Sequence, residues 1–192
     1  MDRPPVRRPL PPGVPSRRRR AAFLLGAAAV LTACTAAPTG PQRLSPELAA
    51  DPLDLTPFAA APCHLLDRPQ LARYFVTTDG TPEPPGCRWT PADTAKLTYR
   101  AAVDLTTGGL EARYRQRPTI PGFTPAQVHS YPAILRDLDV GRCTVETGVA
   151  NDTLLVVTVD APDRALSAHA DPCTEAERFA GTIIGYQGHR KP

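Results

Sequence analysis

The chain has 192 residues, with 22 Lys+Arg against 19 Asp+Glu, which gives a formal charge of +3. Seven of the arginines and one aspartate lie within residues 1–33, so the remainder has 15 basic and 18 acidic residues and a charge of −3. A nucleic-acid-binding domain needs a clustered surplus of Lys and Arg. This composition therefore excludes that class of protein and predicts no nucleic-acid partner.

The N-terminal segment has the pattern of a bacterial export signal. Four arginines (residues 17–20) precede an apolar run over residues 21–31, which leads into Leu31-Thr32-Ala33-Cys34. A cationic start and a short apolar stretch are typical of a signal peptide, and a bilayer span would need about 20 apolar residues. Leu-Thr-Ala-Cys resembles a bacterial lipobox, in which the cysteine becomes the lipidated N-terminal residue. We predict a lipoprotein signal peptide over residues 1–33 and lipidation of Cys34.

A lipid on Cys34 also predicts where the protein resides. Two or three acyl chains hold a protein on a membrane because each buried methylene contributes about 0.8 kcal/mol. The predicted location is the cell membrane, with the protein lipid-anchored on its extracytoplasmic face. An unmodified cysteine after an ordinary signal peptide is the alternative, and Arg19-Arg20 leaves open twin-arginine export beside the general secretory route.

Proline usage predicts how the rest of the chain is divided. Half of the 24 prolines lie at or before Pro62. Residues 34–56 combine prolines and small residues without a sustained apolar period, so we predict a lipidated cysteine followed by a flexible, Pro-rich tether. Residues 57–188 have the core-building pattern of one domain. Residues 189–192 are predicted to be a frayed tail.

Within the domain, apolar periodicity predicts both helices and strands. In chain order, these are helical pieces over residues 62–75 and 110–117, and strands over residues 97–104, 133–138, 143–149 and 153–160. Asp67-Arg68-Pro69 is expected to interrupt the first helical piece. The last two strands flank Ala150-Asn151-Asp152 and predict a β-hairpin. Leu154 to Val159 is apolar on both faces, which places it in the middle of a sheet.

The last helix has the clearest local pattern. Asp171 is a good N-cap, and Pro172 suits the first helical position. The apolar stripe recurs every three or four residues at Ala176, Phe179, Ala180, Ile183 and Ile184, and Gly185 and Gly188 are expected to end the helix. Together these elements predict an α+β fold, in which helices from both ends of the chain cover one face of an antiparallel sheet.

Four cysteines follow the predicted lipidation site, and an even number outside the cytoplasm predicts two disulfides. They are Cys63, Cys87, Cys143 and Cys173. Of the three possible connectivities we prefer Cys63 with Cys87 and Cys143 with Cys173, since each pair would join a helix start to a neighbouring strand. A zinc site is the alternative, but the spacings are wide and no Cys-x-x-Cys occurs. We predict no metal and no cofactor.

Short motifs in a fixed order resemble one known family. They are Ala61-Pro62-Cys63-His64-Leu65-Leu66, Gly86-Cys87-Arg88-Trp89, Tyr131-Pro132-Ala133, Cys143 at the start of a strand, and Asp171-Pro172-Cys173 at the start of a helix. The pattern is similar to a family of small actinobacterial secreted lipoproteins known as domain of unknown function 3558. The resemblance implies a lipid anchor, an α+β domain with two cysteine pairs, and no established catalytic residues. One departure is Val128-His129-Ser130-Tyr131, which lacks the glycine expected before Tyr-Pro.

A search for catalytic patterns gives mainly negative results. The chain has no Gly-x-Ser-x-Gly, no Gly-rich phosphate loop and no His-Glu-x-x-His. Cys63 and His64 are adjacent, and adjacent residues on a helix do not face each other. Two carboxylate pairs, Asp137 with Asp139 and Glu175 with Glu177, fit a strand end and a helix start better than glycosidic hydrolysis. We therefore predict that the protein is not an enzyme.

One charge cluster is a candidate ligand patch. It consists of Arg113, Tyr114, Arg115 and Arg117. Its arginines could bind phosphate or carboxylate groups of lipid headgroups or wall polymers, and the tyrosine could stack on a sugar. The alternative is a solvated helix face. If the patch binds such groups, changing Arg113 and Arg115 to Glu should weaken binding to envelope fractions and leave the melting temperature nearly unchanged.

These observations predict a class of function without a named ligand. The chain is interpreted as a membrane-anchored extracytoplasmic lipoprotein that acts as a non-catalytic binding or interaction module of the cell envelope. Its expected partners are the membrane, through the lipid on Cys34, and an envelope protein or cell-wall ligand. The alternative is a cell-envelope hydrolase with an unrecognised site.

Overall fold

A computed structural model describes most of the chain after residue 41. The described residues are 42–48, 51–92, 97–139, 141–161 and 171–190. Cys34 and the predicted signal peptide lie outside them. Within the described residues, no helix is both long and apolar enough to cross a membrane.

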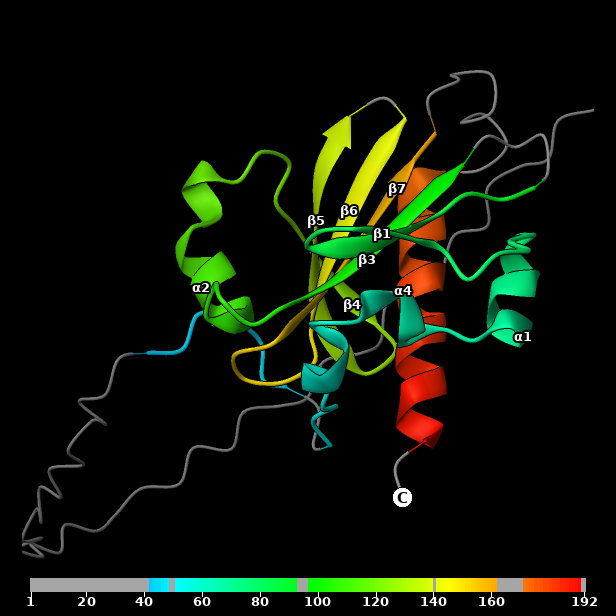
Figure 1. Ribbon diagram of the computed structural model, residues 1–192. Helices are drawn as coiled ribbons and strands as arrows, with labels where there is room; N and C mark the ends of the chain where they lie inside the picture. Colours follow the sequence, from blue (N-terminus) through cyan, green and yellow to red (C-terminus); the bar gives the residue numbers. More distant parts are fainter. Residues whose placement is uncertain (1–41, 49–50, 93–96, 140, 162–170, 191–192) are drawn as a thin grey trace, which may run out of the picture. The chain divides into compact units, whose positions relative to one another are not determined.

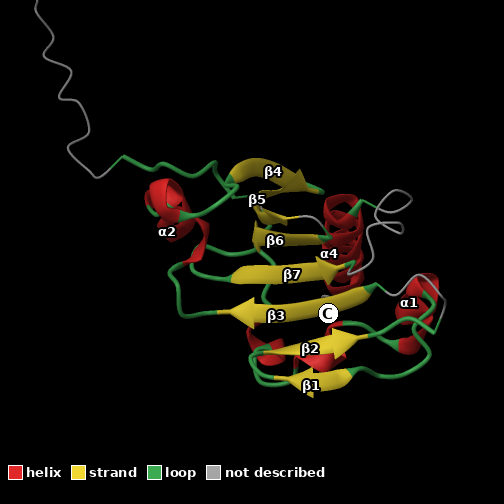
Figure 2. Cartoon of the chain, turned by 90° about the horizontal axis from the view of Figure 1, so that it is seen from above, coloured by secondary structure: helices red, strands yellow, loops and turns green. Residues whose placement is uncertain are grey.

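The central feature is a seven-stranded antiparallel sheet. Its strands are β1 Thr81–Glu83, β2 Gly86–Trp89, β3 Thr98–Asp104, β4 Thr124–Val128, β5 Tyr131–Asp139, β6 Arg142–Gly148 and β7 Leu154–Asp160. The order across the sheet is β1-β2-β3-β7-β6-β5-β4, with every neighbouring pair antiparallel (Figure 2). β7 occupies the middle position, as its two-sided apolar pattern predicts.

Helices pack against both faces of the sheet, and one face carries more helices and the larger core than the other. Short pieces near the N-terminus are η1 Thr56–Phe58, η2 Pro62–Leu65, α1 Arg68–Leu71 and η3 Ala72–Tyr74, and the long C-terminal helix is α4 Pro172–His189. These share one core with one face of the sheet (Figure 1). The other face carries α2 Gly109–Arg115 and η4 Arg117–Thr119 over a smaller apolar cluster. The predicted fold class is confirmed, and the interruption expected near Asp67 separates η2 from α1.

An aromatic cluster fills the core between α4 and the sheet. Phe179 on α4 stacks on Tyr99 of β3 at 4.8 Å between ring centroids and meets the edge of Tyr74 at the same distance. Trp89 of β2 lies 5.5 Å from Phe179. Each of these four side chains is at most 2% exposed. Alternation along β3 and the helical stripe on α4 therefore bring their apolar sides together.

Both disulfides belong to this same side of the molecule. Cys63 in η2 pairs with Cys87 in β2, and Cys143 in β6 pairs with Cys173 in the first turn of α4. The preferred connectivity is confirmed. The bridges close loops of 24 and 30 residues, for which the chain-entropy model gives a stabilisation of about 3 kcal/mol each.

The flexible tether is predicted to extend to residue 56, but the chain packs on the domain before that point. Leu53 and Leu55 are 3% and 0% exposed, and the Leu53 N–H donates to the Val149 carbonyl at 2.9 Å. Earlier still, the Ser45 N–H donates to a Glu111 carboxylate oxygen of α2 at 2.9 Å. The described part of residues 42–56 therefore packs on the domain. The two leucines are spaced for burial on one side of an extended segment, a signal that the surrounding prolines obscure.

The end of the last helix also differs from the prediction. α4 continues through Gly185 and Gly188 as far as His189. The Gln187 side chain donates to the Leu65 carbonyl at 2.7 Å, and the Tyr186 hydroxyl bonds to Asp67. These tertiary contacts hold the last turns against the weak helix propensity of glycine.

Candidate functional site

The four residues of the predicted ligand patch point in different directions. The Arg113 guanidinium turns inward from α2 to the sheet, where its Nε lies 2.7 Å from Oε2 of Glu146. The Arg115 side chain is 53% exposed and pairs with Glu111 one turn away, at 2.9 Å. The sequence offers two alternatives for Arg113, an exposed ligand patch or a solvated helix face. The structure agrees with neither, because Arg113 is directed into the domain.

The other two members of the patch pack on an aromatic ring. Tyr114 meets the edge of Phe123 at 5.1 Å between ring centroids, and the Arg117 guanidinium lies over the same ring at 5.4 Å. Tyr114 is half-buried, and burial raises the pKa of its hydroxyl, with Arg117 acting in the opposite direction. The ring of Tyr114 is thus used within the domain, where it helps to close the smaller apolar cluster.

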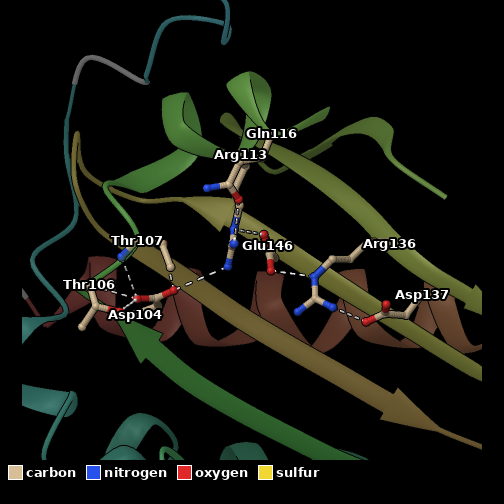
Figure 3. A network of polar contacts seen from close by, with 8 residues as sticks. All are labelled: Asp104, Thr106, Thr107, Arg113, Gln116, Arg136, Asp137 and Glu146. Atoms are coloured by element: carbon tan, nitrogen blue, oxygen red, sulfur yellow. Dashed lines mark hydrogen bonds and ion pairs between the residues drawn. The ribbon is translucent and has the colours of Figure 1, made fainter. Parts of the chain in front are cut away.

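Arg113 belongs to a group of charged side chains that we term the Glu146 network: Asp104, Arg113, Arg136, Asp137 and Glu146 (Figure 3). The Glu146 side chain is fully buried, and the Arg136 Nε donates to its Oε1 at 2.6 Å. Arg113 approaches the second carboxylate oxygen but is not aligned for a hydrogen bond. Burying a charged carboxylate is unfavourable unless opposite charges compensate it, and the two guanidiniums supply that compensation here.

Asp104 completes the network at the end of β3. Burial disfavours its charged form, but hydrogen bonds from Thr106 and Thr107 outweigh burial and lower its pKa. Its carboxylate lies 3.6 Å from the Arg113 guanidinium. Every charge in the Glu146 network thus faces an opposite charge of the same network, which is the arrangement of a structural ion-pair cluster.

A groove along α4 forms a second and different site, with a volume of about 680 Å³. We term it the α4 groove. Gln70 of α1 and Arg73 of η3 form one wall of the groove. Gln127 of β4 and His129 of the following turn form the other wall. The floor is the face of α4 from Glu177 to His189. The sheet-facing stripe of α4 is buried in the core, so this groove occupies the other side of the helix.

Two glycines form part of the floor of the α4 groove. Glu177, Gly181, Gly185 and His189 recur every four residues, a spacing that places them along one face of a helix. A Cβ at Gly181 would lie 2.9 Å from Nε2 of His129, so the close approach of the imidazole requires glycine there. At Gly185 a Cβ would meet nothing within 4 Å. Packing does not require glycine at 185, where alanine would favour the helix by about 1 kcal/mol.

His129 is held in place by its backbone as well as by its ring. It occupies the two-residue turn between β4 and β5, with φ of 52°. The ring Nε2 lies 2.9 Å from the Gly181 carbonyl oxygen. The turn that lacks the expected glycine is therefore built with a histidine in the left-handed conformation, and its ring bridges the hairpin to α4.

The polar side chains of the α4 groove fall into two groups. Four are engaged, and they include His129 and Tyr186, which bond to Gly181 and Asp67. The Arg178 guanidinium donates to Glu175 at 2.5 Å and lies over the Tyr74 ring at 4.5 Å, and the Thr182 hydroxyl bonds to the Tyr74 hydroxyl. Five others make no side-chain hydrogen bond or ion pair with the described residues. They are Gln70, Arg73, Gln127, Glu177 and His189. The groove thus holds hydrogen-bonding capacity that the domain itself does not use.

Two members of this unpaired group are partly removed from water. The Oε1 atom of Gln70 is buried and has no hydrogen-bond partner among the described residues. The pKa of Glu177 is raised, first by burial of its carboxyl and then by the nearby charge of Asp171. Glu177 is the only carboxylate among the described residues that line the groove. Catalysis by two carboxylates therefore lacks its second partner here, whereas recognition by hydrogen bonds does not.

The sequence prediction identified none of these groove residues as a site. The sequence pattern assigns Glu177 to the helix dipole and marks His129 only as part of a segment that lacks the glycine expected before Tyr-Pro. Small or polar residues recur every four positions from Glu177 to His189. This spacing is the one sequence signal for the groove, because it places two glycines on the side of the helix opposite its apolar stripe. The contributions of Gln70 and Gln127 depend on tertiary packing and carry no local signal.

Fold and site together define a disulfide-bonded α+β domain with an open polar groove. The chain belongs to a family described as a protein of unknown function, DUF3558, whose model matches residues 29–186. Neither the curated proteins nor the solved structures contain a match. The family assignment agrees with the resemblance carried by the cysteine, Tyr-Pro and Asp-Pro-Cys motifs.

Proposed function

We propose that this protein is an extracytoplasmic lipoprotein, anchored through Cys34, whose domain is a non-catalytic binding module of the cell envelope. The α4 groove is its binding site. One observation carries this assignment: five polar side chains line the groove without a partner among the described residues. Unpaired polar groups that converge in a concave site are the usual feature of a ligand pocket.

Three observations support an extracytoplasmic, membrane-anchored protein. Leu31-Thr32-Ala33-Cys34 follows a cationic and apolar segment, and the family match begins at residue 29, so it includes this motif. The two disulfides suit an oxidising compartment outside the cytoplasm. The actinobacterial secreted lipoproteins that the sequence resembles carry the same implication.

Mass spectrometry of the N-terminus tests the anchor. The chain is expressed in a bacterial host with its own N-terminal segment and recovered from the membrane fraction. The expected product begins at Cys34 with a diacylglyceryl thioether, and Cys34→Ala should abolish both the modification and the membrane association. An unmodified chain that still begins at Met1 would contradict the proposal.

Chemical-shift mapping tests the binding site. The isotope-labelled chain is titrated with a soluble digest of bacterial cell wall. The amides of His129, Gly181 and Gly185 should shift, whereas Thr144 and Glu146 on the other face of the sheet should not. Shifts confined to the Glu146 network, or no shifts, would show that the α4 groove is not the site for such a ligand.

A hydrolase is the second candidate, and one observation favours it. Burial raises the pKa of Glu177, and a carboxyl with a raised pKa in a cleft is a common general acid. If the groove is catalytic, the chain should release soluble fragments from cell wall, and Glu177→Gln should reduce the rate about 100-fold or more. If wild type and Glu177→Gln both release none, the binding module stands.

A further inference from the structure

The α4 groove also restricts the chemistry of its ligand, an inference that rests on the proposed function. We propose that the ligand is an acidic saccharide: a sugar or short oligosaccharide that carries a carboxylate or a phosphate group. Two sets of unpaired side chains lead to this class. Amides at the walls require hydroxyl groups, and an arginine requires an anion.

The amides indicate hydroxyl groups. Gln127 on one wall is exposed, and its amide oxygen accepts hydrogen bonds. A simple anion such as sulfate offers only acceptors and cannot pair with this oxygen, whereas a sugar hydroxyl donates. On the opposite wall, Gln70 presents a second amide.

The unpaired arginine indicates the anionic group. Arg73 is exposed beside the groove and forms no ion pair with the described residues. Its guanidinium can bind a carboxylate or a phosphate through two parallel hydrogen bonds. The charge of Arg178 is already shared with Glu175 and the Tyr74 ring. Of the two arginines that line the groove, Arg73 is therefore the one that remains available to a ligand.

The floor of the groove fits a ring-shaped ligand. From Glu177 to His189 the helix rises about 18 Å, at about 1.5 Å per residue. The His129 ring covers Gly181, whereas Gly185 carries no side chain and the space above it is open. A saccharide ring can lie on this open part of the floor while its hydroxyl groups reach the amides of the walls.

Calorimetric titration of the full chain with four probes tests the proposal. The probes are glucuronate, a glucose phosphate, glucose and sulfate. We expect glucuronate or the glucose phosphate to bind about tenfold more tightly than glucose, which lacks the charge, and than sulfate, which lacks the hydroxyl groups. The tighter of the two charged sugars identifies the source of the anion.

Matched variants test whether Arg73 binds the anionic group of the ligand. Arg73→Ala should reduce the affinity for the charged sugar about tenfold and leave the affinity for glucose unchanged. Arg88→Ala is the control, because Arg88 is a half-exposed arginine that pairs with Glu83 and does not line the groove. Equal loss in both variants, or no loss in Arg73→Ala, would overturn the role of Arg73.

The remaining outcomes separate this inference from the proposed function. If sulfate or glucose binds as tightly as the charged sugars, or if none of the four probes binds, the ligand is not an acidic saccharide. The groove itself would still be the binding site if the cell-wall digest shifts the amides of Gly181 and Gly185. The absence of those shifts would instead count against the proposed function.

Discussion

The Glu146 network and the α4 groove contain the same kinds of charged side chain, arranged for different purposes. In the network, Arg113 and Arg136 close on a fully buried carboxylate, and Asp104 is held by its own hydrogen bonds. In the groove, Arg73 and Glu177 face a cavity and make no ion pair with the described residues. Charge type alone therefore does not distinguish a binding site from a structural cluster, whereas the presence of internal partners does.

This contrast changes the interpretation of the arginines on α2. The sequence places Arg113 and Arg115 two residues apart in one cluster. In the fold, the first is 18% exposed and bound to a buried acid, and the second is 53% exposed. A substitution test that treats them as equivalent would mix a stability effect with a surface effect.

The largest expected effect is a difference in stability between variants of those two arginines. Arg113→Ala should lower the free energy of unfolding by about 3–5 kcal/mol, because it leaves the buried Glu146 with one counter-charge. Arg115→Ala should change it by about 0.5 kcal/mol or less, since an exposed pair within one helix contributes little. Urea denaturation of both variants measures the difference. Equal stabilities would mean that Glu146 does not depend on Arg113.

The next effect concerns the covalent link on the groove side. Replacing Cys143 and Cys173 together by serine should lower the free energy of unfolding by about 3 kcal/mol, because the unfolded chain regains the freedom of a 30-residue loop. Urea denaturation without reductant measures it. A double variant as stable as the wild type would show that ion pairs and packing alone hold α4 on the sheet.

The smallest effect is a pH dependence with opposite signs in the two regions. The pKa of Glu177 is raised above its ordinary value of 4.5, so its charged form destabilises the fold at neutral pH and protonation relieves this cost. Glu177→Gln should be more stable at pH 7 by about 0.5 kcal/mol or less, a gain that disappears on acidification through the raised pKa.

Asp104 in the Glu146 network should behave in the opposite way. Its pKa is lowered, so the stability that its charged form contributes is present above the ordinary value of 3.8 and is lost as the pH falls through the folded-state pKa. Unfolding curves of Glu177→Gln and Asp104→Asn between neutral and acidic pH measure the two trends. If the difference from wild type follows the same trend in both variants, the assignment of opposite environments is wrong.

Much of the fold follows from local sequence patterns. Asp171 with Pro172 predicts the start of α4, and the two-sided apolar run of β7 predicts its central position. The helix starts at Cys63 and Cys173 lead to the correct disulfide pairing. These features are predictable because each depends on a few neighbouring residues or on a single periodicity.

The elements that the sequence prediction missed are short or lie at sheet edges. β1 and β2 have three and four residues, too few to show a period, and β4 at the other edge contains Pro125. Proline is tolerated at an edge strand because one side of it needs no ladder hydrogen bond. Leu53 and Leu55 were missed for a similar reason, since only the assembled core shows where they pack.

The candidate site was less predictable than the fold. Arg113 was recognised as chemically significant, but its partner Glu146 lies on a strand 33 residues later, and no local pattern connects them. The α4 groove combines three segments from distant parts of the chain. Only its floor has a periodic signal, and in the sequence Gly185 predicts the end of a helix rather than part of a site.

Substitution of two glycines on α4 tests the central claim most directly. Gly185→Leu fills the floor of the groove, whereas Gly188→Leu places the same side chain on the same helix at an exposed position that does not line it. Both variants should fold at least as stably as the wild type, because leucine is the better helix former. The amide shifts induced by the cell-wall digest should be lost in Gly185→Leu and retained in Gly188→Leu. Retention of the shifts in both variants would contradict the assignment of the α4 groove as the binding site.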